Sequence, residues 1–204
     1  GVHGPVANLM TVDKKHAVAI EIALGAGMQN VVVDREEDGK SAINFLKSRD
    51  GGRATFLPLS AIRGDTLKNA AVAKEYGYVG IASELVKFDA KYKNIFENLL
   101  GRTVIVEDMD CGIAIARKFQ NAFRIVTLDG QVLNRGGSMT GGSVSRSAGI
   151  LSRANEVEKL TRQEELYIRI YCLGTVSLTC EWILGVHDAK PEEIADIFFF
   201  KILN

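Results

Sequence analysis

The sequence predicts an α/β fold of mixed α/β and α+β character, in which helices pack in layers on mixed sheets. Three observations support this class. Helical and strand patterns alternate between residues 15 and 128, the same order of patterns occurs twice, and a hairpin signal closes the second round. The chain has 204 residues, 47% of them apolar and 25% charged, so it can bury a core without disulfides or metals.

The first round of patterns begins with a helical stretch in which Ile20 and Leu24 share one stripe. A β-branched run follows as a buried strand, and a second helical stretch is expected to turn Ile43 and Leu46 inward. The predicted elements are a helix at 15–27, a strand at 30–33, an acidic turn at 34–39, a helix at 40–49 and a strand at 54–57 that ends at Pro58.

The second round repeats this order. It consists of a helix at 92–100, a strand at 103–106, an acidic turn at 107–110, a helix at 111–119 and a strand at 124–128. The strands at 31–33 and 104–106 begin 73 residues apart. Chance similarity and a true duplication both explain this spacing, and a duplication predicts two similar α/β halves.

Residues 59–89 connect the two rounds, with a short helix predicted at 70–74 and a turn plus strand at 76–81. After the second round, Asp129 and Gly130 form a dipeptide that is typical of a hairpin turn.

Charge and cysteine content narrow the function classes. The net charge is zero, and residues 1–153 carry 20 Lys and Arg against 16 Asp and Glu, which is too small a surplus to indicate a dedicated nucleic-acid-binding protein. Cys111, Cys172 and Cys180 have no paired spacing. They therefore predict buried apolar residues in a reducing compartment such as the cytoplasm, and neither disulfides nor a zinc site.

The sequence indicates neither a secretory signal nor a membrane span. The chain starts at Gly1 without an initiating methionine and is interpreted as an excised piece. Its most apolar stretch leaves only 11 uncharged residues, 170–180, whereas a spanning helix needs about 20.

The glycine-rich segment, residues 134–143, carries the doublets Gly136-Gly137 and Gly141-Gly142. Glycines can free backbone N–H groups to bind phosphate. However, no Lys-Ser/Thr pair follows them and the order strand, GxGxxG, helix is missing, which argues against a nucleotide site. The alternatives are close approach of a second chain, whose strand could pair with this one, and a plain flexible loop.

Two acidic clusters could bind a divalent metal or serve acid–base chemistry. They are Glu36, Glu37 and Asp38, and Glu107, Asp108 and Asp110. Each stands where a strand gives way to a helix, where carboxylates also complement the helix dipole. His3, His16 and His187 are isolated, and no HExxH or GxSxG motif occurs. We therefore assign no catalytic residue and no metal ligand.

Candidate DNA contacts are the basic residues that flank the glycine-rich segment or the chain ends. They are Lys14, Lys15, Arg135, Arg146 and Arg153. Such charges suffice for contacts to backbone phosphates, but no aromatic side chains are interleaved for base stacking. Solvated surface charge is the alternative interpretation.

Four motifs, in this order, resemble the hinge of a bacterial-type SMC (structural maintenance of chromosomes) protein. They are GVHGPVANLM at 1–10, AIEIALG at 19–25, LDG at 128–130 and NRGGSMTGGS at 134–143. The resemblance covers about residues 1–165. It stops before residues 167–204, which are apolar and irregular where the family pattern predicts a charged, heptad-patterned arm.

The resemblance implies a hinge of two α/β subdomains with mixed sheets. The hinge would span 1–150, with subdomain I at about 1–70, a connector at about 59–89 and subdomain II at about 90–150; the start of a coiled-coil arm would follow at 151–166, and then the atypical tail at 167–204. A ring-shaped homodimer is also implied. Strands of its two protomers would meet at Gly136, Gly137, Gly141 and Gly142.

The implied function is dimerisation of an SMC chromosome condensation and segregation ATPase, with weak DNA binding, in the nucleoid region of the cytoplasm. ATP hydrolysis and kleisin-type subunits would belong to parts of the full-length protein outside this chain, so no cofactor and no membrane contact are expected. One rival hypothesis is an α/β nucleotide- or metal-binding enzyme domain that uses the glycine-rich segment and the acidic turn from Glu107 to Asp110. A second is a dedicated nucleic-acid-binding domain.

Overall fold

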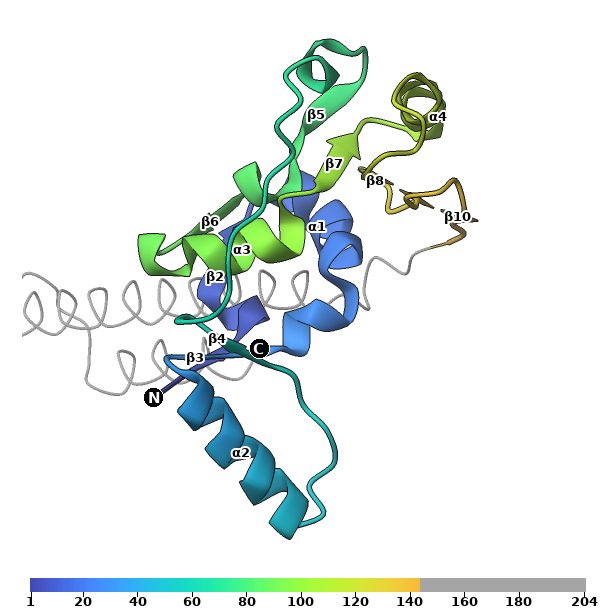
Figure 1. Cartoon of the computed structure of the whole chain (residues 1–204). Coiled ribbons are helices and arrows are strands. Elements are labelled where there is room, and N and C mark those ends of the chain that lie inside the picture. The colour runs from blue at the N-terminus through green and yellow to red at the C-terminus, as the bar shows by residue number, and fades with distance from the viewer. Residues whose placement is uncertain (144–204) are drawn as a thin grey trace, which may run out of the picture. The chain divides into compact units, whose positions relative to one another are not determined.

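The computed structural model describes residues 1–143 (Figure 1). The α-helices of this part are α1 (Ala17–Leu24), α2 (Glu36–Ser48), α3 (Lys93–Leu100) and α4 (Met109–Lys118). The strands are β1 (Val2–Pro5), β2 (Met10–Val12), β3 (Val31–Val33), β4 (Phe56–Pro58), β5 (Tyr78–Ile81), β6 (Val86–Phe88), β7 (Thr103–Val106), β8 (Arg124–Thr127), β9 (Val132–Leu133) and β10 (Met139–Thr140). Short 3-10 helices are η1 (Val6–Leu9), η2 (Lys14–His16), η3 (Gly25–Gln29), η4 (Val72–Lys74), η5 (Ala82–Glu84) and η6 (Ala90–Tyr92).

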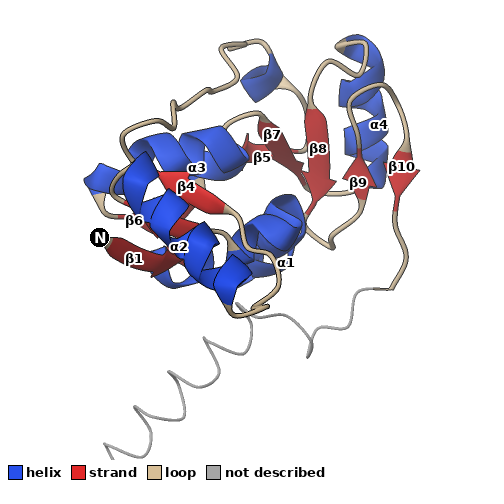
Figure 2. Ribbon diagram, turned by 60° about the horizontal axis from the view of Figure 1, so that its bottom comes forward, coloured by secondary structure: helices blue, strands red, loops and turns tan. Residues whose placement is uncertain are grey.

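The strands form three sheets, with the orders β1-β3-β4, β10-β9-β8-β7-β5 and β2-β6 (Figure 2). The pairs β3–β4 and β7–β8 are parallel and are joined through helices, and the other pairs are antiparallel. Both larger sheets are therefore mixed, and the predicted fold class is confirmed.

The element order of the first half recurs in the second. β1, β2, α1, β3, α2 and β4 are followed by β5, β6, α3, β7, α4 and β8. The pairings recur too, because β3 lies between antiparallel β1 and parallel β4 just as β7 lies between antiparallel β5 and parallel β8. The corresponding strands β2 and β6 pair with each other, with Thr11 opposite Lys87 at the centre of both strands. The repeated pattern in the sequence is thus a duplication of topology.

The core forms where the predicted apolar stripes meet. Ile20 of α1 is fully buried and packs in one cluster with Ile95 and Phe96 of α3. All four residues of β7 are buried, since this strand lies inside the five-stranded sheet. The predicted stripe of Ile20 and Leu24 is confirmed, with exposed fractions of 0% and 8%.

Helix α2 departs from the prediction. It begins at Glu36, so the predicted acidic turn is largely its first helical turn. Gly39 is the buried residue of this helix, where a Cβ would lie 3.5 Å from Cβ of Phe56 in β4. The inward orientation predicted for Ile43 is wrong, because its side chain is 51% exposed. The helix is anchored to the sheet near its first turn and leaves apolar side chains uncovered.

Other differences concern short elements. The predicted helix at 70–74 is the 3-10 helix η4, and Pro58 belongs to β4 instead of following it. The predicted strand at 76–81 and the hairpin at Asp129 are confirmed by β5 and by the β8–β9 pair. The predicted coiled-coil start at 151–166 and the tail at 167–204 lie outside the described residues. Within residues 1–143, no helix is long and apolar enough to cross a membrane.

Candidate functional site

The glycine-rich segment forms the turn and outer strand of a hairpin. Strand β10 pairs antiparallel with β9, with Met139 opposite Leu133. The turn is closed by the Asn134 amide, which donates to the Ser138 carbonyl at 2.8 Å. Gly136 and Gly137 have φ values of 86° and 97°, which favour glycine because other residues are strained there. The hairpin fixes β10 as an edge of the five-stranded sheet.

The other doublet follows β10. Gly142 has a φ of 141°, and a Cβ at Gly141 would collide with Oε1 of Gln131. All four glycines are exposed. In the described chain the segment is preceded by strand β9 and forms a hairpin, so the strand–loop–helix geometry of a dinucleotide site does not occur here.

Within residues 1–143, β1 and β4 are the edges of the three-stranded sheet, and β10 and β5 are the edges of the five-stranded sheet. β10 pairs there only with β9, and β4 only with β3. Such edges present unpaired backbone N–H and C=O groups that can accept another strand. Figures 1 and 2 both show β4 and β10 well apart, so these two edges of one chain do not meet.

Exposed apolar side chains accompany both edges. Met139 of β10 is 55% exposed, and Ile43 and Phe45 of α2, which packs beside β4, are 51% and 58% exposed. The guanidinium of Arg49 lies over the Phe45 ring, 5.1 Å from its centroid.

Helix α4, the counterpart of α2, is better covered. It buries Cys111, Gly112, Ile115 and Ala116. Part of this cover comes from β9, since a Cβ at Gly112 would lie 3.0 Å from Cδ1 of Leu133. In the described first half no strand occupies the position beside β4 that β9 occupies beside β8. In the described residues α2 thus lacks the cover that β9 gives to α4.

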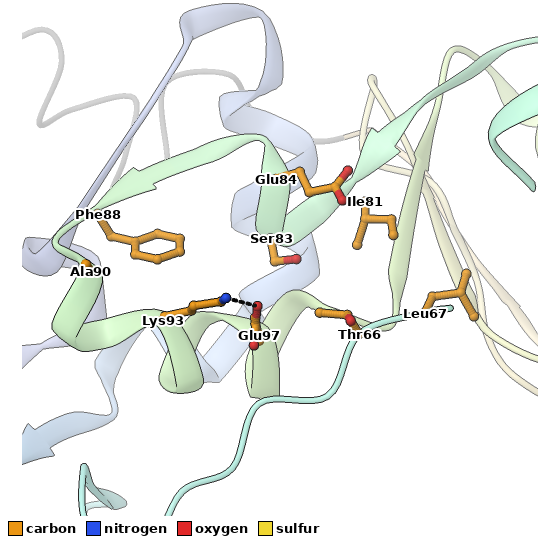
Figure 3. A pocket seen from close by; sticks show the side chains of 9 residues that line it. All are labelled: Thr66, Leu67, Ile81, Ser83, Glu84, Phe88, Ala90, Lys93 and Glu97. Carbon is orange, nitrogen blue, oxygen red and sulfur yellow. Dashed lines mark ion pairs between the residues drawn. The ribbon is translucent and has the colours of Figure 1, made fainter. Parts of the chain in front are cut away.

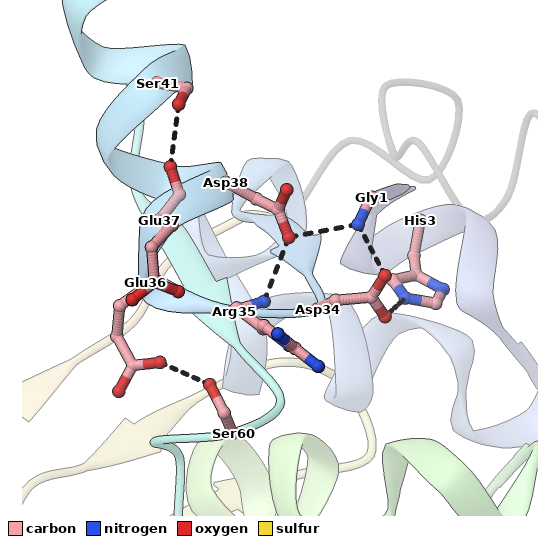
Figure 4. Close-up of polar contacts among 9 residues, drawn as sticks. All are labelled: Gly1, His3, Asp34, Arg35, Glu36, Glu37, Asp38, Ser41 and Ser60. Atoms are coloured by element: carbon pink, nitrogen blue, oxygen red, sulfur yellow. Dashed lines mark hydrogen bonds and ion pairs between the residues drawn. The ribbon is translucent and has the colours of Figure 1, made fainter.

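The acidic clusters act as helix caps. Asp108 accepts a hydrogen bond from the Cys111 amide at 2.8 Å, and this bond lowers the pKa of the Asp108 carboxyl. Asp38 accepts one from the Arg35 amide at 3.2 Å at the start of α2 (Figure 4). Within the described residues, no three His, Cys, Asp or Glu side chains are grouped so as to hold a metal ion.

His3 takes part in a chain of polar contacts beside the Asp38 cap at the start of α2 (Figure 4). Its Nδ1 lies 3.0 Å from the Tyr92 hydroxyl and its Nε2 lies 2.7 Å from Oδ1 of Asp34. The chain links β1, the end of β3 and the start of α3.

One cavity of about 320 Å³ lies between η5, α3 and the segment around Thr66 (Figure 3). Nζ of Lys93 lies 3.7 Å from Oε1 of Glu97 in its lining, and Glu84 adds an exposed carboxylate that has no ion pair among the described residues. The buried polar atoms that lack partners in the described structure, on His16 and Arg124, do not belong to its lining. Within the described residues, its lining therefore contains no buried polar side-chain atom that lacks a hydrogen-bond partner.

The candidate DNA contacts lie on separate elements. Lys14 and Lys15 are exposed on η2, directly after β2, and Arg135 is exposed in the β9–β10 turn. Arg146 and Arg153 lie outside the described residues. The sequence reasoning missed Lys87, which is exposed on β6 opposite Thr11. Strand β6 was not predicted, because Lys87 at its centre interrupts the apolar run.

Comparisons with known proteins agree on one family. The family model for the SMC proteins flexible hinge domain matches residues 1–116. The chain is 43% identical over 185 residues to the chromosome partition protein Smc of Desulfitobacterium hafniense, covering 84% of this chain and 15% of that protein. It is 44% identical over 167 residues to the chromosome partition protein Smc of Bacillus subtilis, covering 80% of this chain and 14% of that protein. The chain thus spans about one seventh of the length of these relatives.

Solved structures give the same answer. An asymmetric dimer of the SMC hinge domain of Geobacillus stearothermophilus is similar with a TM-score of 0.78 at 38% identity, covering 91% of this chain and 76% of that chain. The SMC hinge domain of Pyrococcus furiosus is similar with a TM-score of 0.60 at 37% identity, covering 70% of this chain and 73% of that one.

Proposed function

Because this chain belongs to the family of SMC flexible hinge domains, we propose that it is the dimerisation module of a chromosome partition protein. The hinge of Geobacillus stearothermophilus, which it resembles, is a dimer. The observation that carries the proposal is that β4 and β10 are edge strands of two different sheets and that exposed apolar side chains accompany each of them. Each edge can accept a strand, and neither can reach the other within one copy.

In the proposed dimer, β10 of one copy pairs with β4 of the other. The internal duplication supports this pairing, since β4 corresponds to β8 and β8 carries an antiparallel strand on its outer edge. Pro58, which lacks an amide hydrogen, is compatible with an edge position. A two-fold axis then generates two identical contacts, which close the dimer into a ring.

Handedness supports an antiparallel pairing. Parallel strand–helix–strand units are right-handed, which fixes the face of the sheet on which α2 and α4 lie. If β4 and the partner's β10 run antiparallel, α2 of one copy and α4 of the other lie on the same face of a continuous sheet. The partner's hairpin then covers the position beside β4, where Ile43 and Phe45 are exposed. The four glycines keep the approaching backbone free of side chains.

DNA contact is the second part of the proposal. It uses Lys14, Lys15 and Arg135, together with Arg146 and Arg153, and Lys87 adds a further exposed charge. Within residues 1–143, Lys14, Lys15 and Lys87 form no ion pair that would neutralise them. The near-zero net charge makes this contact weak and salt-sensitive.

The remainder of the proposal concerns the longer protein. ATP hydrolysis and kleisin-type subunits are assigned to parts outside this chain, and the module itself needs no catalytic residue and no cofactor. Its site of action is the nucleoid region of the cytoplasm. The rival enzyme hypothesis has no support from the acidic turn, because Asp108 caps α4.

The test is the solution mass of the full chain by light scattering over a dilution series, for the natural sequence and for Met139→Asp. The natural chain should be a dimer at tens of micromolar, roughly the range in which a specific interface holds. Met139→Asp should be monomeric by light scattering. It should stay folded by circular dichroism, since the side chain it replaces is 55% exposed. Tyr76→Asp, at an 87% exposed position outside the proposed interface, is the matched control. A natural chain that stays monomeric at this concentration would contradict the proposal.

A further inference from the structure

Gln131 holds the end of the glycine-rich segment with its side chain. The Gly142 amide donates to Oε1 of Gln131 at 2.8 Å, and Nε2 of Gln131 donates to the Gly142 carbonyl at 3.1 Å. One carboxamide thus satisfies both backbone groups of a residue 11 positions away. This is the pair of bonds that a neighbouring strand would supply.

The side chain takes this role because the backbone of Gln131 is already used. Its amide donates to Oγ1 of Thr127 at 2.8 Å, and its carbonyl accepts from the Thr127 amide at 2.9 Å. The β9–β10 ladder pairs Val132 with Thr140, so one more step would bring Gly141 opposite Gln131. The backbone ladder therefore stops at that point, and the carboxamide extends it.

Gly141 is matched to this arrangement. A Cβ there would collide with Oε1 of Gln131, the atom that receives the Gly142 amide. The requirement for glycine at 141 is steric, whereas Gly142 has a φ of 141° that disfavours other residues. Both glycines thus permit the two hydrogen bonds between the Gln131 carboxamide and Gly142, which we call the clamp.

We propose that Gln131 is the positioning residue that holds the glycine-rich edge strand ready to pair with a second copy of this chain. This inference rests on the proposed dimer. A two-residue strand such as β10 is only marginally stable alone. Without the clamp, the entropy cost of ordering this strand is added to the free energy of dimer formation. The clamp holds Gly142, two residues after the end of β10, and keeps the exposed backbone extended beyond Thr140.

The variants are Gln131→Ala, which removes both bonds, and Gln131→Glu, which keeps the acceptor for the Gly142 amide but loses the donor. Gln131→Glu also places a carboxylate near Asp129, whose Oδ2 lies 3.5 Å from Nε2 of Gln131. Gln29→Ala is the control, because Gln29 is exposed and has no recorded side-chain hydrogen bond among the described residues.

The experiment is sedimentation velocity of the full chain over a dilution series, with unfolding midpoints and Gly142 amide exchange measured in parallel. Gln131→Ala should weaken dimerisation by about tenfold or more, since each dimer loses the clamp twice and a net hydrogen bond is worth severalfold in affinity. Gln131→Glu should fall between Gln131→Ala and the natural chain. Gly142 amide exchange should accelerate in Gln131→Ala and less so in Gln131→Glu, which keeps the acceptor for this amide, and Gln29→Ala should change neither quantity.

The outcomes separate the two proposals. A natural dimer whose affinity is unchanged by Gln131→Ala overturns the clamp and leaves the dimer standing. A natural chain that is monomeric throughout overturns both. If both variants lose dimer only in proportion to a fall in unfolding midpoint, Gln131 is a general stabilising residue and the positioning role is rejected.

Discussion

The guanidinium of Arg124 donates a 2.8 Å hydrogen bond to the carbonyl of Ala23, and its other terminal nitrogen reaches the Ile22 carbonyl at 3.2 Å. These carbonyls belong to the last turn of α1, where the helix dipole favours a cation. Arg124 stands in β8, so the contact ties the second half of the duplicated fold to the first. Burial lowers the pKa of the guanidinium without removing its charge.

Arg124→Met should lower the free energy of unfolding by about 1–3 kcal/mol, because it leaves two partly buried carbonyls without donors. Denaturant unfolding monitored by circular dichroism measures this change. Arg53→Met, at an exposed loop position, should stay within about 0.5 kcal/mol of the natural chain. Equal effects of the two substitutions would refute the role of Arg124.

Asp108 makes stability depend on acid pH. The hydrogen bond from the Cys111 amide holds the pKa of the Asp108 carboxyl below its usual 3.8, so its contribution is fully present above about pH 4 and is lost as the pH falls through the folded pKa. Asp108→Ala should therefore unfold at a lower temperature than the natural chain at pH 7, and the gap should narrow as the pH falls from 4 towards 2. Thermal unfolding at a fixed protein concentration across this pH range tests it. Asp50→Asn is the exposed control, and a gap that is constant with pH would argue against the prediction.

Gly141→Ala should weaken dimerisation, because the added Cβ collides with Gln131 and displaces the clamp. The effect should be partly relieved in the double variant Gly141→Ala/Gln131→Ala, so the two substitutions should be non-additive. Gly27→Ala is the control, since its Cβ would meet neighbours at an ordinary 3.8 Å. Simple additivity of the two dimerisation free energies would show that Gly141 does not act through Gln131.

The exposed face of α2 should belong to the subunit contact. Phe45→Ser should weaken dimerisation by more than about 1 kcal/mol, as truncation of a buried interface aromatic does, while the monomer keeps its stability. Tyr76→Ser, which also removes an exposed aromatic, should leave the dimer unchanged. Sedimentation equilibrium compares the two, and equal behaviour would place α2 outside the interface.

Lys14→Ala/Lys15→Ala should reduce the affinity for duplex DNA and lower the salt dependence of binding by about two in the log–log slope, if each lysine neutralises one phosphate. Lys118→Ala is the control, because Lys118 is already paired with Glu75 at 2.6 Å. Fluorescence anisotropy at several salt concentrations gives both quantities. An unchanged slope would remove these lysines from the DNA contact.

The sequence was most informative where one periodicity coincided with burial. Strand β7 and helix α3 are buried on their apolar positions, so run length and helical spacing located both. Strand β1 was missed because it contains Gly4 and Pro5, which resemble a turn, and β2 was missed because Thr11 interrupts the continuous apolar run that located β3.

The errors at the candidate site have a different cause. Helical spacing showed that Ile43 lies on an apolar side of α2, but spacing does not reveal whether a second element covers that side. The glycines were recognised from their doublets, whereas Gln131 carries no local signal. Its importance depends on its backbone being engaged by Thr127, a relationship that only the folded turn contains.

The pairing of β10 with β4 of a second copy is tested most directly by mixing two interface variants. Met139→Asp damages the β10 side and Phe45→Asp damages the α2 side beside β4, so each variant alone should be monomeric by light scattering. A mixture can form a heterodimer in which one contact carries both lesions and the other carries neither. Equimolar mixing should restore a dimer mass that is absent from either variant alone, although this dimer should be weaker than that of the natural chain. A mixture that stays monomeric at concentrations where the natural chain is dimeric would contradict the pairing of β10 with β4.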